Sequence, residues 1–239
     1  MNRYIAIILS LALVTAINTA TAGNIKKHKL TVEITNVSNA IYFTPLLVAA
    51  HKRNTHLFQL GTAASMNLQA MAEGGDISGL VADVQAIGGN HVANPAMGLL
   101  GPGATTSAEL KVDRIRNRHL SIVAMLLPTN DGFVGLDAAR IPQRRGTYTY
   151  YLSGYDAGTE ANDELITGGG APGVPGIPAD PGGNAGTGGT GVSGNDHNAT
   201  VHIHRGNVGD LDPAGGASDL NSGVHRWLNP VAIVKLRVH

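Results

Sequence analysis

Apolar and polar residues alternate over short stretches near both ends of the chain. In KLTVEITNV, every second residue from Leu30 to Ile34 is apolar, and threonine and glutamate occupy the positions between them. The closing segment VAIVKLRVH repeats the pattern from Val234 to Val238. A period of two places apolar side chains on one face of a β-strand. Both segments are therefore predicted to be strands with one buried face.

The same reasoning predicts further strands between these two. HLSIVAMLL is more continuously apolar, which favours a more deeply buried strand, and GTYTYYL is rich in aromatic residues. These two stretches give the clearest signal, at 119–127 and 146–152; weaker candidates are 42–50, 105–112, 132–137 and 199–204.

Helical patterns are few and lie early in the chain. One helix is predicted within TAASMNLQAMAEGG, from Thr62 as its N-cap to Gly74, and a second from Ser78 to Ala86. Many short strands, few helices and frequent Gly or Pro residues between them predict an all-β fold. We expect an antiparallel β-sandwich with one or two short helices inserted early in the chain.

Residues 1–22 have the pattern of a secretory signal peptide. An arginine precedes the apolar run IAIILSLALVTAI, and the following ATA is a small-x-small cleavage pattern. The run is shorter than the ~20 residues of a membrane-spanning helix, which disfavours a membrane anchor. Cleavage after Ala22 would leave residues 23–239 as one domain. The predicted product is secreted or periplasmic, with no transmembrane segment after cleavage.

Composition excludes several classes of site. The chain has no cysteine, so it forms no disulfide and has no catalytic thiol or thiolate metal site. Its 17 basic and 17 acidic residues balance. A net charge near zero gives no general attraction to nucleic acid or to anionic membranes, so no nucleic-acid partner is expected.

A Gly- and Pro-rich segment covers about residues 168–195. It reads GGGAPGVPGIPADPGGNAGTGGTGVSGN and has few large side chains to bury. Ordering such a segment costs conformational entropy that its contacts do not return. It is predicted to be a flexible surface loop.

Four of the 17 acidic residues fall within SGYDAGTEANDE, directly after the aromatic strand. Asp156 and Glu160 flank Gly158, and a glycine there permits a sharp reversal that brings both carboxylates together. Crowded carboxylates repel one another unless a cation neutralises them. Calcium suits such a turn because it accepts six to eight oxygen ligands in loose geometry. The alternative is a solvated acidic loop.

An ordered set of motifs resembles a known family. The set comprises LTVEITNVSNA, YFTPLLVAAH, LQAMAEGGD, LLPTNDGFVGLDAARIP and YDAGTE. Together they resemble the N-terminal spondin domain, found in F-spondin and in many bacterial exported proteins. The resemblance implies a C2-like β-sandwich that carries calcium at one edge. Its implied calcium ligands are Asp131, Asp156 and Glu160, with Asn130 or Asp163 as further contributors.

The chain departs from the family pattern at three points. The last acid of the turn is more usually aspartate, so Glu160 reaches one methylene further. Gly132 stands where an aromatic residue is common, and the cysteines of animal members are absent. The first departure is expected to shift ligand geometry without abolishing binding.

A histidine pair offers a second candidate metal site. His202 and His204 lie two apart in a predicted strand and so face the same side, as two zinc or copper ligands do on a sheet. A third ligand would come from His197, His225 or His239. This alternative predicts a periplasmic protein that binds copper or zinc. The interpretation without a metal is that the two histidines lie on a polar face of the strand.

No catalytic motif is present. The serines lie outside any Gly-x-Ser-x-Gly context, and the sequence has no His-Glu-x-x-His helix. The predicted function is therefore an exported, non-catalytic calcium-binding module for binding or adhesion. Its partner, an extracellular or periplasmic ligand, is not identified by the sequence.

Overall fold

The two alternating segments at the ends of the chain pair with each other. The computed structural model describes residues 27–113, 115–193 and 199–239. Strand β1 (Lys27–Asn36) runs antiparallel to β10 (Ala232–Val238), with Ile34 opposite Val234. The alternating apolar side chains of both strands are buried, which confirms the prediction for both segments. The predicted signal peptide, residues 1–22, lies outside the described residues.

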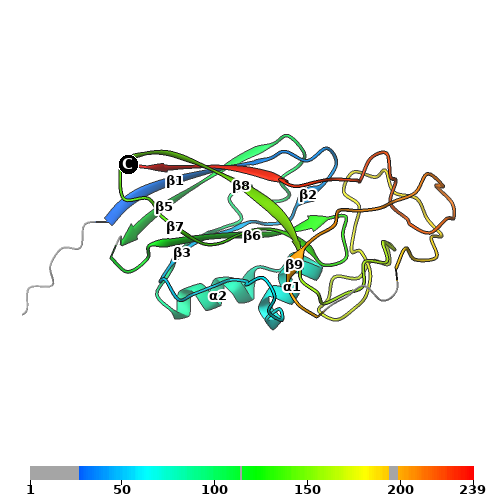
Figure 1. Cartoon of the computed structure of the whole chain (residues 1–239), viewed down its shortest axis with the longest axis horizontal. Coiled ribbons are helices and arrows are strands. Elements are labelled where there is room, and N and C mark those ends of the chain that lie inside the picture. Colours follow the sequence, from blue (N-terminus) through cyan, green and yellow to red (C-terminus); the bar gives the residue numbers. More distant parts are fainter. Residues whose placement is uncertain (1–26, 114, 194–198) are drawn as a thin grey trace, which may run out of the picture.

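Ten strands of the described chain form one antiparallel sheet folded into two layers (Figure 1). The order is β4-β3-β6-β7-β8-β10-β1-β5, while β2 pairs with β6 and β9 with β8. Every pairing between named strands is antiparallel, so the all-β sandwich is confirmed. The remaining strands are β2 (Tyr42–Phe43), β3 (Leu47–His51), β4 (Asn90–Ala93), β5 (Thr105–Asp113), β6 (His119–Leu127), β7 (Gly132–Arg140), β8 (Gly146–Asp156) and β9 (His202–Ile203).

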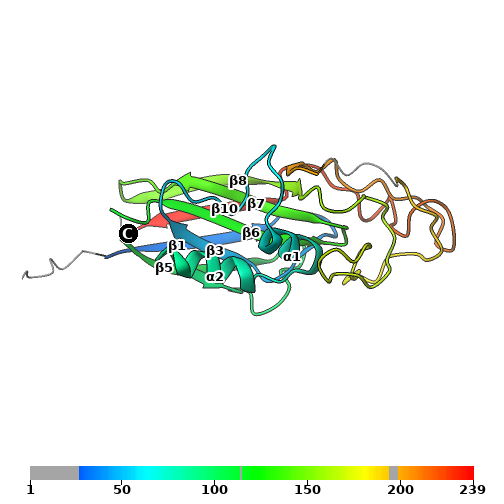
Figure 2. The ribbon, with the colours of Figure 1, turned by 90° about the horizontal axis from the view of Figure 1, so that it is seen from below.

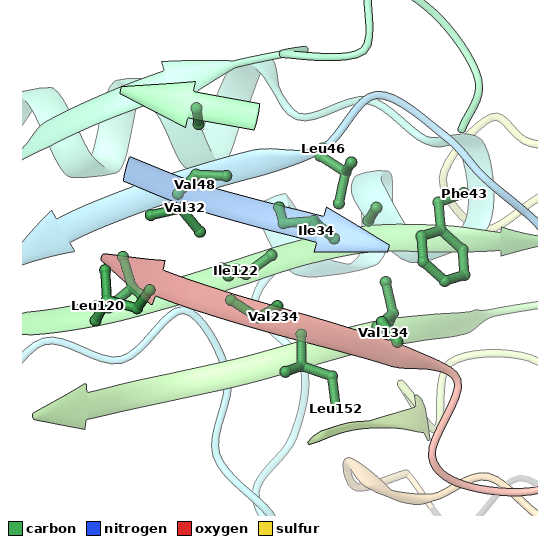
Figure 3. Close-up of a cluster of buried hydrophobic side chains, with 14 of the residues drawn as sticks. Val32, Ile34, Phe43, Leu46, Val48, Leu120, Ile122, Val134, Leu152 and Val234 are labelled. Carbon is green, nitrogen blue, oxygen red and sulfur yellow. The ribbon is translucent and has the colours of Figure 1, made fainter. Parts of the chain in front are cut away.

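Strand β8 belongs to both layers. Residues 146–152 pair with β10, and residues 153–156 pair with β7. Apolar side chains from the two layers fill the space between them, including Val32, Val234 and Ile122 (Figure 3). Because β8 hydrogen-bonds to each layer in turn, its C-terminal end reaches the tip of the β6–β7 hairpin.

Two short helices cover the outer face of the β3–β6–β7 layer (Figure 2). They are α1 (Met66–Gly74) and α2 (Ser78–Ala86). The predicted cap of the first helix, Thr62, is wrong. The Oγ of Ser65 accepts the Leu68 N–H at 3.1 Å, whereas the Thr62 hydroxyl donates to the Gln59 carbonyl and closes a preceding turn. In the described chain no helix has the length and apolarity needed to cross a membrane.

Two weaker strand predictions are interrupted or shortened in the structure, and one strand was not predicted. The 42–50 candidate splits into β2 and β3 around Pro45, which has no N–H to donate to a ladder. The 199–204 candidate shrinks to β9, because Val201 exchanges backbone hydrogen bonds with Gly61 and Thr62 instead of β8. Strand β4 was not predicted, since NHVA is too short to show a period.

Residues 157–193 and 199–231 form a long excursion, mostly without regular structure, beyond one end of the sandwich (Figures 1 and 2). The Gly- and Pro-rich segment lies within it, and its flexibility stays a prediction. The segment nevertheless has defined contacts. Ile177 is fully buried, and the N–H groups of Gly173 and Gly176 donate to Glu73 and Glu160 at 2.6 and 3.0 Å.

Trp227 fixes the returning end of the excursion on β8. Its ring packs over Gly154 and lies 4.9 Å, centroid to centroid, from the ring of His204. A Cβ on Gly154 would overlap the Trp227 ring. The absence of a side chain at this strand position is therefore what lets the tryptophan sit against the sheet.

We expect Gly154→Ala to lower the free energy of unfolding by about 1–3 kcal/mol, as overpacking of a core does. Urea denaturation measures this. In a Trp227→Leu background the added methyl meets a smaller side chain, so the cost of Gly154→Ala falls. An equal cost in both backgrounds would show that Trp227 is not the residue that requires glycine here.

A buried histidine lies at the opposite end of the layer. His51 is fully buried; its Nδ1 lies 2.9 Å from the Lys52 carbonyl and its Nε2 lies 2.7 Å from Ser121 Oγ. The carbonyl only accepts, so Nδ1 carries the proton and Nε2 accepts from the serine. Burial lowers the pKa of His51 from its ordinary value of 6.5, against smaller opposing effects of the Lys52 carbonyl and Asp137.

A lowered folded-state pKa makes His51 a source of acid instability. Its contribution to stability is complete above the unfolded value of 6.5 and is lost as pH falls through the folded pKa. We therefore expect the wild type to lose unfolding free energy relative to His51→Gln as pH falls from 7.5 to 5. Denaturant unfolding across this range provides the comparison, and parallel curves for the two proteins would contradict the assignment.

Candidate functional site

The predicted acidic residues meet at the tip of the β6–β7 hairpin and the end of β8. Asp131 immediately precedes β7, and Asp156 is the last residue of β8. The β7–β8 register places Gly132 opposite Asp156. Glu160 lies in the turn that follows β8, where its N–H donates to Asp131 at 3.1 Å. All three side chains are buried.

The turn before Asp131 is closed by a threonine. Thr129 Oγ1 donates to the Leu126 carbonyl at 2.6 Å and accepts the Gly132 N–H at 3.0 Å. A Cβ on Gly132 would lie 2.6 Å from this hydroxyl. Gly132 thus lets the turn close tightly, at the position where the resemblance leads one to expect an aromatic residue.

Asp131 organises the turn after β8 through one of its two oxygens. Oδ2 accepts the backbone N–H of Thr159 at 2.7 Å and that of Glu160 at 3.1 Å, together with the Thr159 hydroxyl at 3.1 Å. Oδ1 is buried and has no hydrogen-bond partner. One oxygen of this carboxylate is therefore hydrogen-bonded, and the other is buried without a hydrogen bond.

The other two carboxylates divide their contacts differently. Asp156 Oδ1 accepts the Gly158 N–H at 2.7 Å, and Oδ2 accepts from Asn162 Nδ2 at 2.8 Å. Gly158 has φ 73°, and a Cβ there would lie 2.5 Å from backbone atoms of Thr200. Glu160 Oε2 accepts the Gly176 N–H, while its Oε1 is buried without a hydrogen-bond partner.

The site holds negative charge that no basic side chain compensates. Burial, reinforced by the neighbouring Asp156, raises the pKa of Asp131 to about 7. Burial also raises the pKa of Glu160 to about 7, with smaller contributions from Glu73 and Asp131. Within the described residues, no lysine or arginine forms an ion pair with Asp131, Asp156 or Glu160. His202 Nε2, at 3.6 Å from Asp156 Oδ2, is the one ring nitrogen at ion-pair distance there.

The unpartnered oxygens of Asp131 and Glu160 fit a cation that prefers oxygen ligands. Burying a carboxylate oxygen without a partner is costly, and a bound calcium ion would remove that cost. The described part of the chain contains no group of three or more His, Asp or Glu side chains arranged to hold one ion. An ion at this site would therefore also need backbone carbonyls and water as ligands.

The two further candidate ligands contact each other. Asn130 Nδ2 donates to Asp163 Oδ1 at 2.8 Å, and Asn130 Oδ1 accepts the Glu164 N–H at 3.2 Å. They thus link the hairpin tip to the turn after β8. Sequence reasoning missed two other participants, Asn162 and Glu73. Asn162 lies two residues beyond Glu160, but Glu73 comes from the end of α1, and no local spacing indicates it.

The histidines of the alternative site have separate partners. His202 Nδ1 lies 2.9 Å from the Thr200 carbonyl, whereas His204 packs on Trp227 and accepts the Gly206 N–H through Nδ1. Of the proposed third ligands, His225 is buried beside Asp180 and His239 contacts Thr31. The remaining one, His197, lies outside the described residues. No three-ligand histidine site forms among the residues that are described.

Comparisons with known proteins identify the family of this chain. The Spondin_N family model matches residues 34–165, which is more than half of the chain and includes Asp131, Asp156 and Glu160. Human Spondin-2 is 30% identical over 126 residues, which cover 50% of this chain and 38% of the human protein. The chain thus matches well under half the length of that relative. By the family match, this chain belongs to the spondin N-terminal domain family.

Proposed function

We propose that this chain is an exported, calcium-dependent binding or adhesion module without catalytic activity. The observation that supports it most directly is the pair of buried carboxylate oxygens, Asp131 Oδ1 and Glu160 Oε1, that lack hydrogen-bond partners. Export rests on the signal-peptide pattern of residues 1–22.

Calcium would act here as a structural link. Asp131 and Glu160 are its proposed side-chain ligands, with Asp156 beside them, and the ion would supply the positive charge that this cluster lacks. Asp131 lies on the β6–β7 hairpin, and Glu160 contacts the Gly-rich segment through Gly176. An ion held between them would fix the hairpin tip and the excursion relative to each other. Loops fixed in advance lose less entropy when they bind a partner.

The burial of the cluster argues against a catalytic role. A carboxylate that acts as a general acid or base has to reach a proton on its substrate. Asp131 is fully enclosed, and Asp156 and Glu160 are nearly so. Their hydrogen bonds go to backbone and side-chain groups of neighbouring turns, which is typical of a structural role.

Calcium is expected to stabilise the folded chain selectively. Extracellular calcium modules bind with a Kd of about 10⁻⁴–10⁻³ M, so 10 mM calcium would contribute about 1.4–2.7 kcal/mol and raise Tm by roughly 3–10 °C. Thermal unfolding in chelator and with calcium, magnesium, zinc or copper tests this. A rise with zinc or copper alone, abolished by His202→Ala, would instead support the histidine alternative and overturn the calcium proposal.

Asp131→Asn separates a ligand from a merely structural aspartate. The variant removes a buried charge, so in chelator its Tm should equal or exceed that of the wild type. In calcium its Tm should fall below that of the wild type by most of the calcium-induced rise. Asp212→Asn, at an exposed position in the same excursion, is the matched control and should respond to calcium as the wild type does. Equal losses for Asp131→Asn in both conditions would contradict calcium binding by this carboxylate.

A further inference from the structure

Four arginines gather at the end of the sandwich opposite the acidic cluster. Arg53 follows β3, Arg116 and Arg118 lie in the connection between β5 and β6, and Arg140 ends β7. The strand register brings them together: His119, the first residue of β6, lies opposite both His51 on β3 and Arg140 on β7. Along the nine residues of β7 the two ends are about 27 Å apart.

These residues line a pocket of about 520 Å³. Its lining consists of Arg53, Ile115, Arg116, Arg118, His119 and Arg140. The volume lies within the range of small-molecule sites, and none of the described lining residues is acidic. The pocket is therefore a basic cavity in a chain whose overall charge is zero.

The positive charge of the pocket is largely uncompensated. Arg116 Nε lies 3.8 Å from Asp113, which also accepts the Ile115 N–H. Among the described residues, no carboxylate forms an ion pair with Arg53, Arg118 or Arg140. Three guanidinium groups thus face one cavity without counter-charges, an arrangement that attracts an anion.

His119 lies within this excess of positive charge. Its Nδ1 is enclosed and lacks a hydrogen-bond partner. Burial lowers the pKa of His119, and His51, Arg53, Arg118 and Arg140 lower it further. A bound anion would reverse the electrostatic effect of the arginines on this ring.

The backbone that carries the arginines is fixed without a ligand. Asn117, between Arg116 and Arg118, is buried and donates through Nδ2 to the Gly88 carbonyl and to Asn90, both at 3.0 Å. The Arg118 carbonyl accepts the Ile141 N–H at 2.8 Å. Because these contacts hold the connection to β4 and to the residue after β7, the pocket is already formed.

We propose that this pocket binds a small ligand that carries phosphate or sulfate ester groups. A guanidinium presents its N–H donors in a planar fork, which matches two oxygens of such a group. Among the described residues, no Phe, Tyr or Trp ring on which a nucleic-acid base would stack lines the pocket, and Ile115 is the one apolar residue of that lining. The site is separate from the proposed calcium site and does not require that ion.

Isothermal titration in calcium-free buffer tests the proposal with two probes, inorganic pyrophosphate and sucrose octasulfate. At least one of the two probes should bind, and uncharged sucrose should not. Tighter binding of pyrophosphate would indicate phosphate recognition, and tighter binding of sucrose octasulfate would indicate sulfate recognition. Arg53→Gln/Arg140→Gln should weaken binding at least about tenfold, since both lost groups make charge-assisted hydrogen bonds. Both residues are exposed, so Tm should be unchanged.

Arg144→Gln/Arg145→Gln is the matched control. These exposed arginines lie in the turn between β7 and β8, at the same end of the sandwich but outside the pocket lining. The control should bind within about twofold of the wild type, because exposed charges beyond the pocket are screened by salt. Failure of both probes to bind would overturn the proposal. So would equal weakening by the two double variants, or equally tight binding of single-stranded DNA.

Discussion

Strand β8 is the constraint on which both the sandwich and its acidic end depend. Its first seven residues complete the β5–β1–β10 layer, and its last four complete the β4–β3–β6–β7 layer. One strand thus closes the fold and delivers Asp156 to the tip of the β6–β7 hairpin. Gly154, near the crossing point, leaves room for Trp227, so the C-terminal part of the chain returns to the sheet where β8 changes layers.

The two ends of the β6–β7 hairpin carry opposite charge. Within the described residues, Asp131 and Glu160 are buried at one end with no lysine or arginine paired to them, and at the other end Arg53, Arg118 and Arg140 line a cavity whose described lining has no carboxylate. The net charge of the chain does not reveal this separation of charge, because acidic and basic residues are equal in number. Because the hairpin lies in the middle of its layer, the two clusters are joined by a rigid, buried element and are held at a fixed distance.

Much of the fold was predictable because its strands obey a simple period. Alternation from Leu30 to Ile34 required a one-sided strand, and the 119–127 run matched β6 residue for residue. The misses have local causes. Thr62 has a residue type that often caps helices. The helix is nevertheless capped by Ser65, whose hydroxyl accepts the otherwise unpaired N–H of Leu68, three residues later.

The sites were predictable to different degrees. Asp131, Asp156 and Glu160 lie in two short motifs, so the resemblance identified them together. Glu73 could not be predicted from the sequence, because its approach to Glu160 depends on how α1 packs on the sheet. The basic pocket could not be predicted from the sequence for a similar reason. Its arginines come from two connections and from the end of β7, and only the register of β3, β6 and β7 shows that they are neighbours.

Besides its backbone–backbone hydrogen bonds, the excursion after β8 is held by acidic side chains that accept backbone N–H groups. Glu164 binds the N–H groups of Val208 and Gly209, and Asp210 binds those of Ala217 and Ser218. Every residue except proline offers this donor, whatever its side chain. Where φ is negative, the outward side chains of these loops can be exchanged without losing the bonds that shape them. The outward surface of the excursion can thus vary in sequence while its acidic anchors stay in place.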